Sequence, residues 1–170
     1  MTRVPLKPEH RRGGLITQGS MLVGNSTGED SHPIKRAVWI LERLLDDPPS
    51  PPPANVPALD PETPGFAKLS LKDQLGVHRQ DEACVNCHRK IDPWGIPLEH
   101  YDATGLYRTE ALRLTAEKKG GTRNQVEKAP LDATDTMTDG QAINGVEQLK
   151  HYILSEKKND FTKALVTKLT

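Results

Sequence analysis

The sequence predicts a mainly α fold that ends in a small α+β part, a hairpin followed by two helices. Apolar side chains recur at helical spacing in several separate stretches, which is the pattern of amphipathic helices. One strong turn signal, Asp139-Gly140, predicts a hairpin near residues 131–144, and further helices are expected from Asn144 and from near Asp160. Hydrophobic residues make up 35% of the 170 residues and aromatic residues only 4%, so the helices alone would build a thin core.

The first helix is predicted from about residue 33 to residue 45. Ser31 or His32 can cap its start, and Pro33 suits the first turn because the helix does not use the N–H that proline lacks. Residues 48–64 follow with repeated prolines, which favour an extended polyproline conformation. We interpret this segment as a stiff spacer along the surface of one small domain. The apolar stripe of the helix comprises Ile34, Val38, Leu41 and Leu45.

A second helix is predicted to start at Ser70, because Ser70 and Asp73 have the spacing of a capping box. We expect this helix to continue through residue 88. Pro93 and Gly95 disfavour helical structure, so the chain is expected to leave the helix directly after that point.

The most informative motif is Cys-Val-Asn-Cys-His at residues 84–88, the C-x-x-C-H pattern of c-type haem attachment. Two thiols separated by two residues reach the two vinyl groups on one edge of a porphyrin and form thioethers. His88 then lies under the ring, where its imidazole binds iron as the proximal ligand. Cys84 and Cys87 are the only cysteines, so one haem c would use both thiols. A buried porphyrin would also add bulk to the thin core.

Other interpretations of the two cysteines are a structural zinc site, a thiol redox pair, a plain disulfide or a chance match. Zinc usually takes four ligands from paired motifs, whereas this chain has no third cysteine and its other histidines are widely spaced. A thioredoxin-like pair normally opens a helix after a buried strand, whereas residues 70–78 have the pattern of a helix. Haem attachment is therefore the favoured hypothesis, and the others stay open.

Further residues are candidates for contacts with haem. Ile91 and Trp94 can wrap the porphyrin edge, although ordinary core packing would also account for Trp94. His78 lies on the helix that leads into the motif, which keeps it on the proximal side or at the haem edge. The candidate distal ligands are Met21, in a glycine-rich stretch, and His32, and an open iron site is the third option. Methionine would raise the reduction potential, a second histidine would generally lower it, and an open site would permit small-ligand chemistry.

Bulk properties argue against several classes of partner. The net charge is zero and the pI is about 7.0, which indicates neither nucleic acid nor an anionic membrane. No apolar run approaches the ~20 residues of a membrane-spanning helix, and no pairing of nucleophile and base indicates an enzyme. The N-terminus lacks the apolar stretch of a signal peptide, yet covalent haem attachment takes place outside the cytoplasm. We therefore expect a piece of a larger exported, periplasmic protein, with the signal peptide upstream and a truncated C-terminus.

Several stretches resemble the C-terminal part of the large multi-domain cytochrome-like proteins of planctomycete bacteria. They are residues 13–20, 31–45, 78–99 and 101–105. Residues 131–170 are similar to the domain that follows in the same proteins. These domains are of unknown function, so the resemblance implies architecture and export more than activity. It implies that Cys84 and Cys87 are thioether anchors and that His88 is the proximal ligand.

These observations predict a cytochrome c-like haem domain over residues 1–105 and a small accessory domain over residues 106–170. We expect one covalent haem and single-electron transfer with other redox domains of the parent protein or with a soluble electron carrier. One alternative is a haem domain whose open distal site serves small-ligand sensing or catalysis. The other is a haem-free zinc or interaction module.

Overall fold

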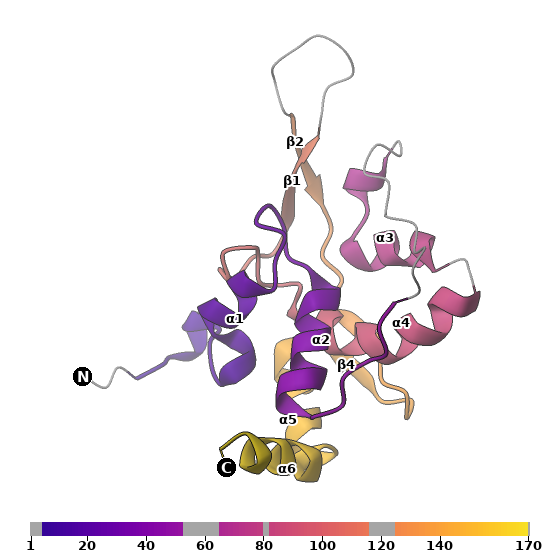
Figure 1. The fold of residues 1–170 in the computed structure, drawn as a ribbon. Coiled ribbons are helices and arrows are strands. Elements are labelled where there is room, and N and C mark those ends of the chain that lie inside the picture. The colour runs from indigo at the N-terminus through magenta and orange to yellow at the C-terminus, as the bar shows by residue number, and fades with distance from the viewer. Residues whose placement is uncertain (1–4, 53–64, 80–81, 116–124, 170) are drawn as a thin grey trace.

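The computed structural model describes residues 5–52, 65–79, 82–115 and 125–169, and it shows a mixed α+β fold that is about half helical. The α-helices are α1 (Gly19–Gly24), α2 (Pro33–Leu44), α3 (Leu71–His78), α4 (Glu82–Gly95), α5 (Gly145–Ser155) and α6 (Lys158–Leu169). The strands β1 (Ala111–Thr115) and β2 (Gln125–Ala129) form one antiparallel hairpin, and β3 (Thr134–Thr136) and β4 (Ala142–Asn144) form another. Figure 1 shows the β1–β2 hairpin extending away from the helices, with α6 at the opposite end. Among the described residues, none of the helices is long and apolar enough to cross a membrane.

Helix α2 is the first predicted helix. At its start, His32 Nδ1 accepts the backbone N–H of Lys35 at 3.4 Å, which confirms the predicted cap. Its inward face is rotated from the predicted stripe, because Ala37 is fully buried whereas Ile34 is partly exposed. The small side chain of Ala37 lets α4 approach closely, and hydrophobic spacing alone does not indicate which neighbour a helix will contact.

The predicted second helix is two helices in the structure. Ser70 Oγ accepts the backbone N–H of Asp73 at 3.0 Å, so the predicted N-terminal cap is confirmed. The helix that it caps, α3, ends at His78, and the chain enters α4 at Glu82. Only α4 carries the C-x-x-C-H motif.

Helix α4 continues beyond the point where the sequence predicts its end. It includes Pro93 and ends at Gly95, so the expected break directly after residue 88 is wrong. An internal proline removes one hydrogen bond and crowds the preceding turn. Residues 91–99 are all buried, and we attribute the continuation of α4 to this packing, which outweighs the local cost of the proline.

Residues 111–129 contain a hairpin that the sequence did not predict. β1 and β2 pair from Ala111 opposite Ala129, and both alanines are buried. Leu112 and Val126 are exposed, so the strands lack the apolar alternation that identifies a half-buried strand. Because of this second hairpin, the fold is α+β and not mainly α.

The predicted hairpin near residues 131–144 is confirmed as β3–β4. Gly140 in its turn has φ 91°, a conformation that glycine adopts without the steric cost of a side chain. Helix α5 begins after Asn144 as predicted, but the backbone N–H of Asn144 donates to Gln148 Oε1 at 2.7 Å. The last predicted helix is present as α6.

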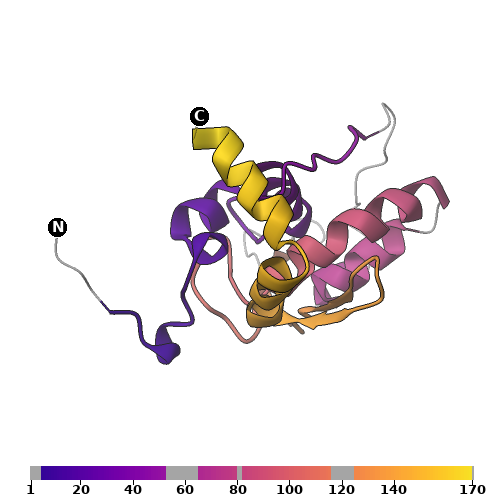
Figure 2. The same ribbon diagram turned by 90° about the horizontal axis from the view of Figure 1, so that it is seen from below.

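One hydrophobic cluster joins the N-terminal helices to the C-terminal part of the chain. The cluster therefore contains residues of both predicted domains, 1–105 and 106–170. Figure 2 shows α6 lying across α2, and the two helices are in contact. The buried members are Ile16, Met21, Leu22, Ala37, Ile40, Leu41, Leu44, Leu45, Ile91, Trp94, Leu98, Tyr101, Met137, Ile143, Leu149, Tyr152 and Ile153.

A fully buried guanidinium holds the segment after α4 against α2. Arg36 lies on α2, and its nitrogens donate to the backbone carbonyls of Leu98 at 3.0 Å, Tyr101 at 2.7 Å and Asp102 at 2.7 Å. Burial lowers the pKa of Arg36 to about 10, which still leaves it charged at neutral pH. The carbonyls of Leu98 and Asp102 also accept the backbone N–H groups of Tyr101 and Gly105, so the guanidinium is an added charged donor that ties the segment after α4 to α2.

Candidate functional site

The two cysteines share one face of α4 with the residues predicted to contact haem. Cys84, Cys87, Ile91 and Trp94 follow one another at intervals of three, four and three residues, the spacing that aligns side chains along one side of a helix. Both thiols are free and partly buried. The face is anchored at one end by Trp94, which is buried, and is more open toward Cys84.

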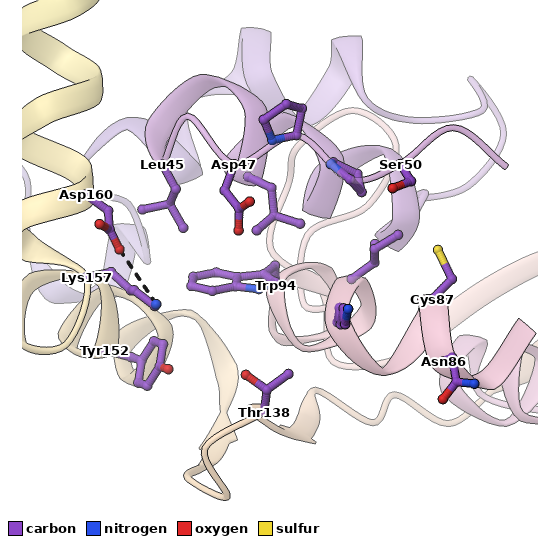
Figure 3. Close-up of a pocket in the computed structure, with 15 residues that line it drawn as sticks. Leu45, Asp47, Ser50, Asn86, Cys87, Trp94, Thr138, Tyr152, Lys157 and Asp160 are labelled. Atoms are coloured by element: carbon purple, nitrogen blue, oxygen red, sulfur yellow. Dashed lines mark ion pairs between the residues drawn. The ribbon is translucent and has the colours of Figure 1, made fainter.

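A cleft of about 620 Å³ lies beside this face. Its size falls within the range of roughly 300–1,000 Å³ of small-molecule and cofactor sites. The indole of Trp94 extends from α4 between Leu45 and Tyr152, as Figure 3 shows. The apolar part of the wall comprises Leu41, Leu45, Pro48, Pro49, Ile91, Trp94 and Tyr152, and polar groups of the wall come from Asp47, Ser50, Asn86, Cys87, Lys90, Thr138, Lys157 and Asp160.

Aromatic and charged contacts define the side of the cleft nearest α6. The rings of Trp94 and Tyr152 meet edge to face, with centroids 5.7 Å apart and planes at 62°, an arrangement that aromatic pairs favour. Lys157 Nζ and Asp160 Oδ2 form an exposed ion pair at 3.6 Å (Figure 3). The cleft therefore has an apolar, aromatic floor and a polar, solvent-exposed rim.

The first part of the predicted proline spacer is a wall of the cleft. Pro48 and Pro49 line it opposite α4, together with Asp47 and Ser50. The proline content of this segment predicted a surface spacer. Proline content does not indicate which part of the protein a segment packs against. The remainder of the predicted spacer, residues 53–64, lies outside the described residues.

The imidazole of His88 is held by a buried carboxylate. His88 Nδ1 lies 2.9 Å from Asp92 Oδ1, one helical turn further along α4. The other carboxylate oxygen of Asp92 lies 3.0 Å from Arg79 Nη1. Asp92 is 0% exposed and the His88 side chain 17%, so the imidazole reaches the surface while its carboxylate partner does not.

The structure brings some predicted site residues to the cleft and places others elsewhere. Cys87, Ile91 and Trp94 line it, whereas Cys84 and His88 are not among the residues of its wall. Met21 is 4% exposed within the hydrophobic cluster, and the His32 ring caps α2. Neither candidate distal residue lies among the side chains of the cleft wall. The side chain of His78, the last residue of α3, is outside the described part of the structure.

A conventional metal site has no support within the described ranges. In residues 5–52, 65–79, 82–115 and 125–169, no group of three or more His, Cys, Asp or Glu side chains is arranged to hold a metal ion. A structural zinc site requires about four such ligands converging on one point.

Sequence reasoning missed two contributors to the site. Asp92 follows His88 by four residues, a spacing at which side chains meet on a helix, and this signal could have identified it. Tyr152 follows Leu149 by three residues on α5, so it shares the buried side of that helix.

Comparison with known proteins gives a family and no activity. The sequence profile of the family PSCyt3, described as a protein of unknown function (DUF1588), matches residues 12–111. This range contains all the helices of the site except α5 and α6, and all the stretches up to residue 105 that carry the resemblance noted above. No curated protein and no solved structure gives a significant match. For residues 131–170 the resemblance remains a prediction. Because the profile covers more than half of the sequence, the chain belongs to the PSCyt3 (DUF1588) family.

Proposed function

We propose that this protein is a c-type cytochrome domain that holds one covalent haem through Cys84 and Cys87, with His88 as the proximal iron ligand. It would pass single electrons to or from other redox domains of a larger exported protein, or a soluble electron carrier. The observation that carries the proposal is the C-x-x-C-H motif on α4, whose Cys87 lines a cleft of cofactor size beside Ile91 and Trp94.

The residues of the cleft fit a large, flat, mostly apolar group. When bound, haem supplies one-electron redox chemistry, and the protein sets its ligation, burial and exposure to water. Leu41 on α2, Leu45 directly after it and Trp94 on α4 would exclude water from one side of the cleft. Lys90 and Asn86 give the cleft a cation and an N–H donor, which suit a group that carries carboxylates at one edge. The proposed fit thus depends on a cleft wall that has both an apolar part and a polar part.

A haem whose sixth position is open to small ligands is the second candidate. It is favoured by the positions of Met21 and His32, which lie in the hydrophobic cluster and at the α2 cap and not in the cleft wall. An open position permits binding of small gaseous ligands, whereas a sixth protein ligand favours electron transfer. Carbon monoxide added to the reduced protein separates the two: a large spectral change supports the open site, and no change supports electron transfer.

The proposal is tested by producing the chain with an export signal in cells that have haem-maturation machinery. We expect a coloured protein whose haem remains attached through denaturing electrophoresis, and whose oxidised and reduced spectra are those of a haem c. The matched control is the double variant Cys84→Ala with Cys87→Ala, which should lose the attached haem. A folded, colourless wild-type protein would overturn the proposal, and metal analysis would then decide between zinc and no metal.

A further inference from the structure

We infer that Asp92 is the positioning residue for His88: it fixes the imidazole with the proton on Nδ1 and the lone pair on Nε2, and strengthens it as an electron donor. This inference rests on the proposed function for the identity of the iron ligand. It adds a residue to the site that neither the C-x-x-C-H motif nor the family description assigns.

The side chains of His88 and Arg79 are positioned to stabilise the buried carboxylate of Asp92. Asp92 is completely buried, one of its oxygens faces His88 Nδ1 at 2.9 Å, and the other faces Arg79 Nη1 at 3.0 Å. A buried carboxylate is costly unless it is paired and hydrogen-bonded. His88 supplies a hydrogen bond to one oxygen and Arg79 an ion pair to the other, so the compensation comes from α4 and from the residue that follows α3.

The direction of the hydrogen bond determines which ring nitrogen carries the hydrogen. A carboxylate oxygen accepts, so in this contact Nδ1 carries the hydrogen and Nε2 bears the lone pair. Carboxylate partners of this kind hold metal-binding histidines in one tautomer and orientation and raise their basicity. A more strongly donating His88 stabilises the oxidised iron, which lowers the reduction potential. Arg79 opposes part of this effect, because its positive charge withdraws negative charge from Asp92.

Two other histidines provide internal references for the tautomer. His100 Nδ1 lies 3.1 Å from the backbone carbonyl oxygen of Arg108, and a carbonyl accepts, so His100 also carries its hydrogen on Nδ1. His32 has the other tautomer, because its Nδ1 accepts a backbone N–H. We therefore expect His88 to share the nitrogen NMR signature of His100 and to differ from His32.

The first experiment uses the haem-loaded chain. In the reduced protein, the Nδ1–H proton of His88 should be visible and slow to exchange with solvent, because its partner is buried. Asp92→Ala should accelerate that exchange. Asp92→Asn keeps an acceptor oxygen and removes the charge, so the reduction potential should shift to a more positive value. Arg79→Gln should shift it to a more negative value.

Asp135→Asn is the matched control, because Asp135 is a half-buried aspartate whose pKa is raised by burial and by the nearby charge of Asp92. Its Oδ1 accepts the backbone N–H of Thr136 at 2.8 Å, so the variant removes a nearby carboxylate while keeping the His88–Asp92 contact. In Asp135→Asn we expect the Nδ1–H proton of His88 to exchange as in the wild-type protein. The reduction potential should shift less than it does in Asp92→Asn. Equal shifts from Asp92→Asn and Asp135→Asn would reduce the effect to a general charge effect and overturn the inference.

The second experiment separates this inference from the proposed function. In the chain produced without haem maturation, nitrogen NMR at pH ~9, where an ordinary imidazole is neutral, should show His88 with its hydrogen on Nδ1. The signatures of His100 and His32 report in the same spectrum that the fold is present. A His88 hydrogen on Nε2 would overturn the positioning role, whereas a wild-type chain that attaches no haem would overturn the haem assignment.

Discussion

Gly95 at the end of α4 is packed against the backbone of Pro33 at the start of α2. A β-carbon on residue 95 would lie 1.9 Å from the Pro33 carbonyl oxygen and 2.7 Å from its carbonyl carbon. Gly95 has φ −110°, which other residues adopt freely, so the requirement for glycine is steric and not conformational. This contact sets how closely the helix that carries the cysteines approaches α2.

The first prediction is that Gly95→Ala destabilises the protein. The methyl group would force α4 away from α2, and such overpacking costs about 1–3 kcal/mol or more. Urea denaturation followed by circular dichroism measures the change in the free energy of unfolding. Gly76→Ala is the control, because Gly76 lies inside α3 with open space around it and should gain about 0.5–1 kcal/mol from helix propensity. Equal effects of the two variants would show that the α2–α4 contact is not tight.

The second prediction concerns the buried guanidinium of Arg36. Arg36→Met fills similar space but removes a charged donor from the carbonyls of Leu98, Tyr101 and Asp102. Leu98 and Asp102 keep backbone N–H donors, whereas the Tyr101 carbonyl loses the donor that Arg36 supplies. A buried acceptor that loses its partner costs about 1–3 kcal/mol, so we expect a loss of at least about 1 kcal/mol in the free energy of unfolding.

Arg43→Met on the same helix is the matched control for Arg36→Met. The Arg43 side chain is 60% exposed and lies 3.9 Å from Glu42, and exposed ion pairs of this kind contribute little. Its substitution should change the free energy of unfolding by no more than about 0.5 kcal/mol. If both variants unfold at the same urea concentration, the carbonyl contacts of Arg36 do not stabilise the fold.

The third prediction is a pH dependence of stability caused by Glu99. Burial raises the pKa of Glu99 to about 7, even though its carboxylate accepts from Ser31 Oγ at 3.0 Å and lies 3.4 Å from Arg108 Nη2. The unfolded chain has the ordinary value of 4.5. Between these two values the folded state binds more protons than the unfolded state, so stability falls as pH rises. The total change is on the order of 3 kcal/mol.

Glu99→Gln tests this assignment, because glutamine does not titrate. The free energy of unfolding is measured by urea denaturation at steps from pH ~4.5 to pH ~7.5 for both proteins. We expect the wild-type protein to lose stability relative to the variant across this interval. A constant difference between the two proteins would mean that Glu99 titrates alike in the folded and unfolded states, contrary to the effect of its burial.

The fourth prediction concerns the histidines of the haem-loaded protein. His88→Ala should change the visible spectrum more than substitution of any other single histidine, because His88 is the proposed proximal ligand. His151→Ala is the control, since His151 is exposed on α5, and its spectrum should match that of the wild-type protein. A spectrum that is unchanged by His88→Ala would show that another residue binds the iron.

Local signals in the sequence were sufficient for several elements. The caps at His32 and Ser70 form as predicted, because a cap depends on a few neighbouring backbone groups. The Asp139-Gly140 turn likewise forms from residues adjacent in sequence. The β1–β2 hairpin was missed, since its exposed apolar side chains and buried alanines reverse the usual pattern of a strand.

The sequence alone determined the C-x-x-C-H motif and most helix starts, since these depend on residues within a few positions of one another. Only the tertiary structure decided that α4 runs through Pro93, and that the prolines at 48 and 49 face that helix across a cleft. It alone paired Asp92 with both His88 and Arg79. The physical reason is that burial and packing join groups distant along the chain, and the free energy of those contacts exceeds the local preferences that a sequence pattern expresses.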